Sequence, residues 1–153
     1  MSIDERLAAL NISLPDASNP QGSYSNCART GNLLFVSGKG PAAGLAVPPQ
    51  GKLGREFSVQ QGYEFARLAG LDILAALQLE LGNLDRVSRV VKLQGFLNAT
   101  DTFDQHPKVL DGCSDLMVDV FGDKGLHARS VFGANSVRSD LPLVIDSIFE
   151  ISE

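Results

Sequence analysis

The chain has 153 residues, enough for one domain with a hydrophobic core, and its 44% hydrophobic and 20% charged residues are typical of a globular protein. No apolar run approaches the roughly eighteen residues of a membrane-spanning helix, and residues 1–15 lack the basic start and long apolar segment of a signal peptide. The net charge of −5 argues against a nucleic-acid partner, because binding phosphates requires a basic surface. We interpret the short basic stretch RVSRVVK, residues 86–92, as a solvated strand edge.

Cys27 and Cys113 are the only cysteines, and they lie far apart in the sequence. Two isolated cysteines are typical of a reducing compartment, which predicts a cytoplasmic protein with free thiols. The chain contains neither a CxxC nor an HExxH pattern. We therefore expect no metal site and no cofactor.

The first third of the chain predicts a short helix, a hairpin and a long loop. Ser2 and Glu5 form a capping box at the start of a helix over residues 2–10. The turn-forming residues 30–32 separate two apolar runs, which indicates a β-hairpin. Residues 38–54 are dense in Gly and Pro, and loops of this length in compact domains are often functional.

A long amphipathic helix follows the loop. Ser58 and Gln61 form a second capping box, apolar residues recur at helical spacing, and Gly82 is a natural stop. Gly70 lies inside the apolar stripe, where glycine costs about 1 kcal/mol relative to alanine. We expect the missing side chain at this position to let the helix lie close to a sheet.

The remaining elements complete the predicted fold. The sequence predicts a strand over residues 85–98, a second helix over 107–121, and two strands over 128–137 and 143–151. Strands, helix, strand, helix and two strands make an α+β pattern, with the helices on one face of a mostly antiparallel sheet. No repeat or linker interrupts the chain, which predicts a single domain over residues 1–153.

The last predicted strand is apolar on both faces. Leu143, Ile145 and Phe149 point to one side, whereas Val144 and Ile148 point to the other. A strand of this kind has to be covered on both sides. Because the predicted helices cover only one face of the sheet, the second face is expected to pack against another copy of the chain.

The strand that begins near residue 128 carries the residues best suited to binding an anion. The planar guanidinium of Arg129 can pair with a carboxylate through two hydrogen bonds. His127 lies two residues earlier and therefore on the same face of the strand. Either residue could instead be an ordinary surface residue at the start of a strand. Ser37 also follows a predicted strand, but no base lies near it in the sequence.

Three segments resemble the reactive intermediate deaminase family, also called Rid or YjgF, whose members are often described as "endoribonuclease L-PSP" or "translation inhibitor". The segments are GSYSNCARTGNLLFVSGKGP (22–41), GYEFARLAGLDILAALQLELGNLDRVSRVVKLQGFLNATDTF (62–103) and HARSVFG (127–133). The stretches ERLAALNISLP and KVLDGCSDLMVDVFGDKGLHARSVFG resemble a longer subgroup of this family.

The resemblance implies a chorismate-mutase-like fold and a homotrimer. In such a trimer the sheets pack inward, the helices lie outside, and a ligand cleft lies at each subunit interface. The best understood members hydrolyse enamine and imine intermediates released by pyridoxal-phosphate enzymes, and they need no cofactor of their own. The expected ligand is thus a small carboxylate or imine, and the products are a 2-oxo acid and ammonia.

The resemblance also assigns site residues. Arg129 matches the arginine that binds the substrate carboxylate, and Tyr24 matches the tyrosine of the cleft. Ser37 and Gly38 match a serine–glycine pair that ends a strand beside the cleft. Val131 occupies a position whose backbone contacts the ligand.

The chain departs from the family pattern at the position of the presumed catalytic acid. The family commonly has a glutamate fifteen residues after the arginine, where this chain has Val144. Valine can neither accept a proton nor hold a water molecule. Asp146 points to the same face roughly 6 to 7 Å farther along the strand, and it matches a second acidic position of the subgroup. The alternative base is His127, which could instead form a structural hydrogen bond under the second helix.

Three functions are therefore considered. The first is a deaminase that hydrolyses small 2-imino acids, with Arg129 binding the carboxylate and Asp146 or His127 as the catalytic residue. The second is a non-catalytic binder of small carboxylates in the same cleft, which Val144 favours. The third is an endoribonuclease, which we rank last because of the acidic charge balance.

Overall fold

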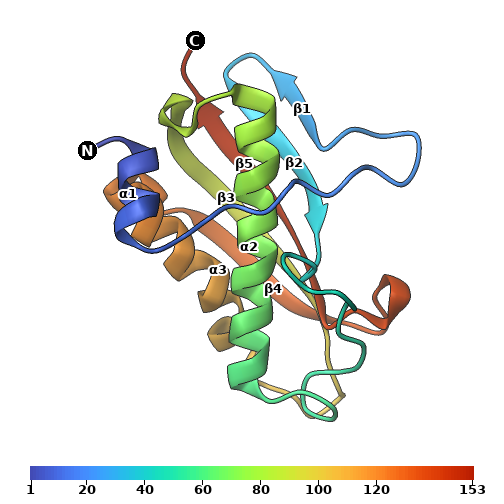
Figure 1. Ribbon diagram of the computed structural model, residues 1–153. Helices are drawn as coiled ribbons and strands as arrows, with labels where there is room; N and C mark the ends of the chain where they lie inside the picture. The colour runs from blue at the N-terminus through green and yellow to red at the C-terminus, as the bar shows by residue number, and fades with distance from the viewer.

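The computed structural model describes residues 1–153 and contains one five-stranded sheet with its helices on one face (Figure 1). The elements are α1 (Ile3–Ala9), β1 (Cys27–Thr30), β2 (Leu33–Lys39), α2 (Val59–Leu81), β3 (Val87–Asn98), α3 (His106–Phe121), β4 (Ala128–Ala134) and β5 (Leu143–Ile151). The strand order is β1-β2-β5-β3-β4, and every pairing is antiparallel except that of β3 with β4. The predicted α+β class and element order are confirmed.

The capping residues and the turn glycines form the local structures that the sequence predicts. The Ser2 hydroxyl accepts a hydrogen bond from the Glu5 backbone N–H, and Ser58 caps α2 in the same way. The left-handed φ of 78° at Gly82 ends α2, because glycine adopts this conformation without steric cost. Gly31 has a φ of 58° in the hairpin turn between β1 and β2. These contacts join residues close in sequence, so they do not depend on the rest of the fold.

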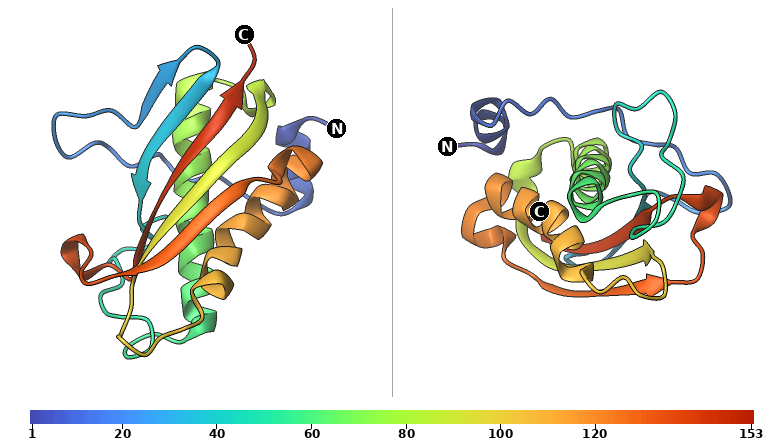
Figure 2. Two further views of the ribbon diagram at one scale, coloured as in Figure 1. Left: turned by 180° about the vertical axis from the view of Figure 1, so that it is seen from behind. Right: turned by 90° about the horizontal axis from the view of Figure 1, so that it is seen from below.

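Helices α2 and α3 pack against each other and against the same face of the sheet (Figure 2). An ideal Cβ at Gly70 would lie 2.8 Å from Leu116 Cδ2 and 3.1 Å from Cys113 Sγ, and both of these atoms belong to α3. The prediction that Gly70 lets α2 approach the sheet was therefore wrong about the partner. The missing side chain allows the two helices to approach closely.

Strand β3 is not a strand edge, so the interpretation of residues 86–92 was also wrong. β3 lies between β5 and β4, and its side chains Val90 and Leu93 are fully buried. Ser88, Arg89, Val91 and Lys92 reach solvent to different degrees, because the register of β3 shifts on either side of Val90. Sequence pattern alone could not place β3 in the middle of the sheet, because the order of strands is set by long-range pairing.

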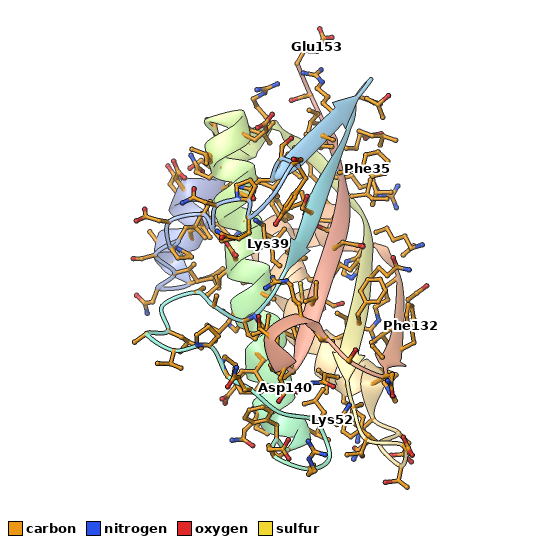
Figure 3. The ribbon with its side chains drawn as sticks, turned by 90° about the vertical axis from the view of Figure 1, so that its right-hand side faces the viewer. Phe35, Lys39, Lys52, Phe132, Asp140 and Glu153 are labelled. Atoms are coloured by element: carbon orange, nitrogen blue, oxygen red, sulfur yellow. The ribbon has the colours of Figure 1, made fainter.

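The face of the sheet opposite the helices is open and carries exposed aromatic side chains among polar ones. Phe35 and Phe132 are 42% and 44% exposed, and they project away from α2 in Figure 3. Phe132 packs edge-to-face against Phe96, with ring centroids 5.0 Å apart. The burial of β5 alternates along its length, so Val144 and Ile148 lie on the open face as expected, together with Asp146 and Glu150. None of the helices is both long enough and apolar enough to cross a membrane.

Candidate functional site

The residues predicted for the site lie in three places within the subunit. Ser37, Gly38 and Asp146 line a cavity on the open face of the sheet, Tyr24 and Gly38 line a second cavity, and His127, Arg129 and Val131 lie on or beside β4.

The cavity on the open face has a volume of about 390 Å³. Asp146 on β5 is paired with Gln94 on β3, and both line the cavity together with Ser37 and Gly38 at the end of β2. The carboxylate of Asp146 accepts no hydrogen bond within the chain. Burial raises the pKa of this carboxyl group, and the nearby positive charge of Lys92 only partly opposes the shift. A carboxyl group with a raised pKa is suited to proton transfer.

Val144 lies on the same face of β5, directly beside Gly38. An ideal Cβ at Gly38 would lie 2.6 Å from Val144 Cγ1, so any larger residue at position 38 would displace the valine. The valine therefore fills space next to the backbone of Gly38. Val144 itself does not line the cavity, and Asp146 is the acid that does.

Arg129 points toward α3 and not toward the Asp146 cavity. Its Nη1 atom lies 2.8 Å from Asp111 Oδ1 and donates to Ser114 Oγ at 3.0 Å. Its Nη2 atom donates to the carbonyl of Pro107 at 3.4 Å, and the side chain is 27% exposed. Arg129 thus lies on the helix-facing side of the sheet, whereas Asp146 lies on the open side. One subunit does not bring the two residues together.

His127 is held by hydrogen bonds on both ring nitrogens. Nδ1 lies 2.6 Å from the Gly125 carbonyl oxygen, and Nε2 lies 2.9 Å from Ser114 Oγ. A carbonyl oxygen only accepts, so we infer that Nδ1 carries a proton and donates to the Gly125 carbonyl oxygen. Ser114 Oγ contacts both His127 and Arg129. The contact with His127 is a hydrogen bond beneath α3, which matches the structural role considered as the alternative for this histidine. The role of Ser114 was not predicted.

Val131 packs its side chain against the core, and its backbone pairs with Gly95 of β3. An ideal Cβ at Gly95 would lie 3.3 Å from Val131 Cγ2. The side chain therefore serves packing, and only the backbone of Val131 is left for contact with a ligand at the edge strand β4.

The second cavity, of about 360 Å³, contains Tyr24 and the backbone of Gly38. Tyr24 is 56% exposed, and its hydroxyl oxygen accepts a hydrogen bond from the Gln21 N–H at 3.2 Å. Arg138, in the turn between β4 and β5, also lines this cavity. The resemblance did not assign any role to Arg138.

A buried polar chain forms part of the wall of this second cavity. Lys39 is only 4% exposed, and its Nζ donates to Ser18 Oγ at 3.0 Å. The Ser18 hydroxyl donates in turn to Asp72 Oδ2 at 2.8 Å, and Asp72 is also 4% exposed. Neither Lys39 nor Asp72 was predicted from the sequence to be buried and paired. Asp72 interrupts the apolar stripe of α2, and this was the available signal, because a charge at a buried position requires a partner.

No group of three or more His, Cys, Asp or Glu side chains is arranged to hold a metal ion.

Comparison with known proteins identifies the family. Residues 4–149 match the model of the family described as "YjgF/chorismate mutase-like, putative endoribonuclease". The chain belongs to this YjgF family. The predicted resemblance to the Rid/YjgF proteins and to the chorismate-mutase-like fold is therefore confirmed.

Several relatives match the YjgF chain over nearly its whole length. Protein TCP17 of Trypanosoma cruzi is 35% identical over 147 residues, which cover 95% of this chain and 92% of the relative. A solved structure from Shewanella oneidensis MR-1, with the same endoribonuclease description, has a TM-score of 0.94 at 31% identity and covers 99% of this chain and 100% of that chain. The Agrobacterium tumefaciens protein Atu1372, of unknown function, has a TM-score of 0.89 at 34% identity, and the match covers 98% of this chain and 92% of that chain.

Proposed function

We propose that this YjgF-family protein hydrolyses small 2-imino acids to 2-oxo acids and ammonia, in a cleft completed by association of the chain into a homotrimer. The observation that carries the proposal is the unpaired Asp146 carboxyl group, whose pKa is raised by burial, in one cavity with Ser37 and Gly38. A partly desolvated acid without a salt-bridge partner is costly to keep, and such groups occur preferentially where proton transfer is needed.

In the proposed reaction the Asp146 carboxylate accepts a proton from a water molecule as that water adds to the C=N carbon. The protonated acid then returns this proton to the amino nitrogen of the tetrahedral intermediate. As the carbonyl group of the 2-oxo acid forms, Asp146 transfers the second proton of the added water to the same nitrogen, so that the C–N bond breaks with ammonia as the leaving group. General acid–base assistance of this type contributes about 10²- to 10⁴-fold to a rate.

A homotrimer accounts for the position of Arg129. Arg129 and Asp146 lie on opposite faces of the sheet within one subunit, so in the proposed assembly they meet only across a subunit boundary. The open face around Phe35 and Phe132 supports such an assembly, because exposed aromatic surface of this kind is typical of an interface. The imino acid carboxylate then binds to an Arg129 supplied by a neighbouring copy.

A second candidate is a binder of small carboxylates without turnover. Two observations favour it: Val144 replaces the acid that the family places at this position, and Arg129 is already paired with Asp111. An endoribonuclease is not proposed, because the net charge of −5 does not favour binding of a polyanion. The free, buried thiols of Cys27 and Cys113 support our placing the protein in the cytoplasm.

The experiment that tests the proposal follows the decay of 2-iminopropanoate, generated in situ by an amino-acid oxidase. Native protein should accelerate the decay, and Asp146→Asn should slow the catalysed reaction about a hundredfold or more. Asp104→Asn, at an exposed acid outside the cavities, is the matched control and should react like native protein. His127→Gln tests whether His127, the alternative candidate, is the catalytic base; if Asp146 is the base, this variant should still accelerate the decay.

The result of the same assay separates the two candidates. No acceleration by native protein, together with measurable binding of pyruvate, would assign the binder. Acceleration that survives in Asp146→Asn but is lost in His127→Gln would transfer the role of base to His127.

A further inference from the structure

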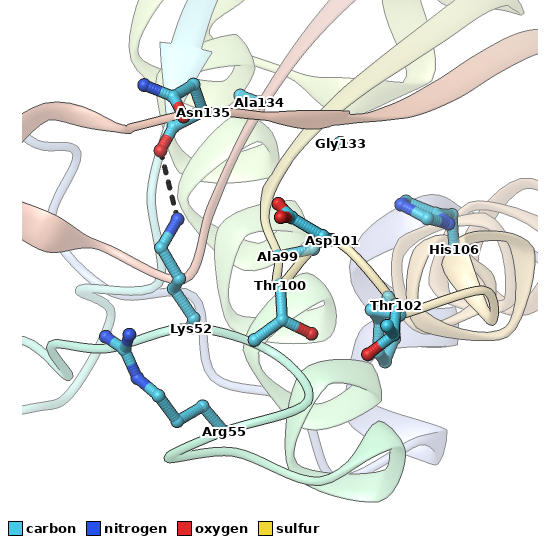
Figure 4. A pocket seen from close by; sticks show the side chains of 11 residues that line it. Lys52, Arg55, Ala99, Thr100, Asp101, Thr102, His106, Gly133, Ala134 and Asn135 are labelled. Carbon is cyan, nitrogen blue, oxygen red and sulfur yellow. Dashed lines mark hydrogen bonds between the residues drawn. The ribbon is translucent and has the colours of Figure 1, made fainter.

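We propose a second ligand site, for a small hydroxylated anion, in a cavity at the ends of β3 and β4 (Figure 4). The cavity has a volume of about 710 Å³, which is within the range of about 300–1,000 Å³ typical of small-molecule sites. Its walls come from the loop before α2, from the segment that joins β3 to α3, and from the end of β4. It shares no lining residue with the Asp146 cavity or with the Tyr24 cavity.

Lys52 supplies the positive charge of this cavity. Its Nζ donates to Asn98 Oδ1 at 2.7 Å and to the Asn135 carbonyl oxygen at 3.0 Å, and Figure 4 shows the second of these bonds. An ammonium group has three donors, so one N–H remains for a ligand. Both partners are neutral, and no carboxylate lies within salt-bridge distance of Lys52. The charge of Lys52 is therefore oriented by neutral partners, and the Glu56 carboxylate interacts with it only at longer range, without a salt bridge.

The partners of Lys52 are themselves held in place. Asn98 is 1% exposed, and its Nδ2 donates to Asp140 Oδ1 at 2.9 Å and to the Gly51 carbonyl oxygen at 3.2 Å. The remaining amide oxygen thus faces Lys52. Asp140 and its neighbour Ser139 both have left-handed φ values, of 54° and 55°, a conformation that non-glycine residues rarely adopt. Ser139 lines the Tyr24 cavity and neither residue lines this one, so these dihedral angles describe the turn that holds Asn98 and do not themselves mark a ligand site.

His106 faces the same cavity from the first turn of α3. Its ring packs edge-to-face against Phe103, with ring centroids 5.1 Å apart. Neither ring nitrogen has a hydrogen-bond partner within the chain. An ideal Cβ at Gly133 would lie 3.1 Å from His106 Nε2, so the absence of a side chain at position 133 makes room for the ring. The imidazole is thus positioned by packing while its nitrogens stay free to bind a ligand.

The other lining residues indicate which ligand the cavity would take. Only three of the eleven lining residues are hydrophobic, which favours a polar ligand. Thr100 and Thr102 offer hydroxyl groups, and the carboxylate of Asp101 projects between Lys52 and His106 in Figure 4. A carboxylate repels a ligand that is anionic throughout, but it accepts hydrogen bonds from hydroxyl groups. We therefore expect a phosphate or carboxylate group at Lys52 and hydroxyl groups at Asp101.

A purely structural role for Lys52 would explain its two hydrogen bonds, but not the free nitrogens of His106 or the space that Gly133 provides. Arg55 also lines the cavity, but its guanidinium is paired with Glu56, so we assign the binding charge to Lys52.

The test is titration calorimetry of the full chain with ribose 5-phosphate, gluconate and inorganic phosphate, with uncharged ribose as a reference. At least one hydroxylated anion should bind with one site per chain, and ribose should bind at least tenfold more weakly. Lys52→Met should weaken binding about ten- to a hundredfold, whereas Lys108→Met, at an exposed lysine outside the cavity, should have no effect. Preference for ribose 5-phosphate over gluconate assigns a phosphate ligand, and the reverse preference assigns a carboxylate.

Gly133→Ala provides a variant that keeps Lys52 and Asn98 unchanged. The added methyl group should displace the His106 ring and weaken binding while the thermal stability stays close to that of the native protein. Three outcomes would overturn the proposal: none of the anions binds, ribose binds as tightly as ribose 5-phosphate, or Lys52→Met and Gly133→Ala both bind like native protein. None of these outcomes depends on imine hydrolysis.

Discussion

Arg129 Nη1 lies 2.8 Å from Asp111 Oδ1, so the arginine expected to bind a substrate carboxylate already pairs with a carboxylate of its own subunit. A ligand therefore competes with Asp111 for the guanidinium. The exposure of the pair, 27% and 45%, makes this exchange inexpensive, because exposed ion pairs contribute about 1 kcal/mol or less.

Changes at the two partners should affect ligand binding in opposite directions. Arg129→Ala should weaken the binding of pyruvate about ten- to a hundredfold, and Arg129→Lys should recover only part of the loss, because an ammonium lacks the planar fork. Asp111→Asn should tighten binding, because it removes the competing carboxylate. Asp119→Asn, on the outer side of the same helix, is the control. Titration calorimetry measures all four, and equal affinity in native protein and Arg129→Ala would place the carboxylate elsewhere.

Val144→Glu should raise the rate of imine hydrolysis, by up to the 10²- to 10⁴-fold that a proton-transfer group typically contributes. The new carboxylate would project from the open face of β5, beside Gly38, and not into the core between sheet and helices. Imine decay is compared at equal concentrations of native and variant protein. Leu79→Glu, at an exposed residue of α2 far from this face, controls for the added charge. A variant no faster than native protein would show either that Asp146 already acts as the acid in the reaction or that the cleft does not catalyse imine hydrolysis.

Asp146→Asn should stabilise the fold at neutral pH but not in acid. The raised pKa of Asp146 means that ionisation costs stability, and this cost develops as the pH rises from the unfolded-state pKa, about 3.9, through the higher folded-state value. Removing the carboxylate should therefore raise Tm at pH 7, and the gain should vanish at about pH 3, where both states are protonated. Thermal unfolding across this range, with Asp104→Asn as reference, measures the effect. A gain that is larger in acid would contradict the direction of the shift.

Native protein should behave as a trimer of 16.3 kDa chains in light scattering. Phe132→Asp should dissociate it into folded monomers, because Phe132 is 44% exposed within a subunit and its loss leaves the core intact. Leu79→Asp, at a residue 72% exposed on α2, should leave the trimer unchanged. Native protein that remains monomeric at all concentrations would contradict both the trimer and the cleft built on it.

Both cysteines should resist thiol reagents while the chain is folded. Burial raises the pKa of Cys113 to about 12, and burial together with the charge of Glu80 raises that of Cys27 to about 11. Because only the thiolate reacts, labelling with a chromogenic disulfide at pH 8 should be slow in buffer and fast in denaturant. Rapid labelling of one thiol in the native state would reveal local opening around it.

Features that depend on neighbours in the sequence were predicted correctly. The capping boxes at Ser2 and Ser58, the hairpin turn at Gly31 and the stop at Gly82 each involve residues within a few positions of one another. Their hydrogen bonds and dihedral angles are local properties, so the residues involved suffice to predict them. The alternation of β5 is equally local, and it indicated the open face.

The tertiary structure alone decided which residues meet. Arg129 finds Asp111 on α3, Gly70 faces α3 instead of the sheet, and β3 takes a central position in the sheet. Lys52 is held by Asn98, 46 positions away. Contacts of this kind follow from how the helices and strands pack, and the same local pattern is compatible with many packings. The sequence thus determined the elements and the family, whereas the packing of α3 and of the loop before α2 determined which charges face a cavity and which are paired.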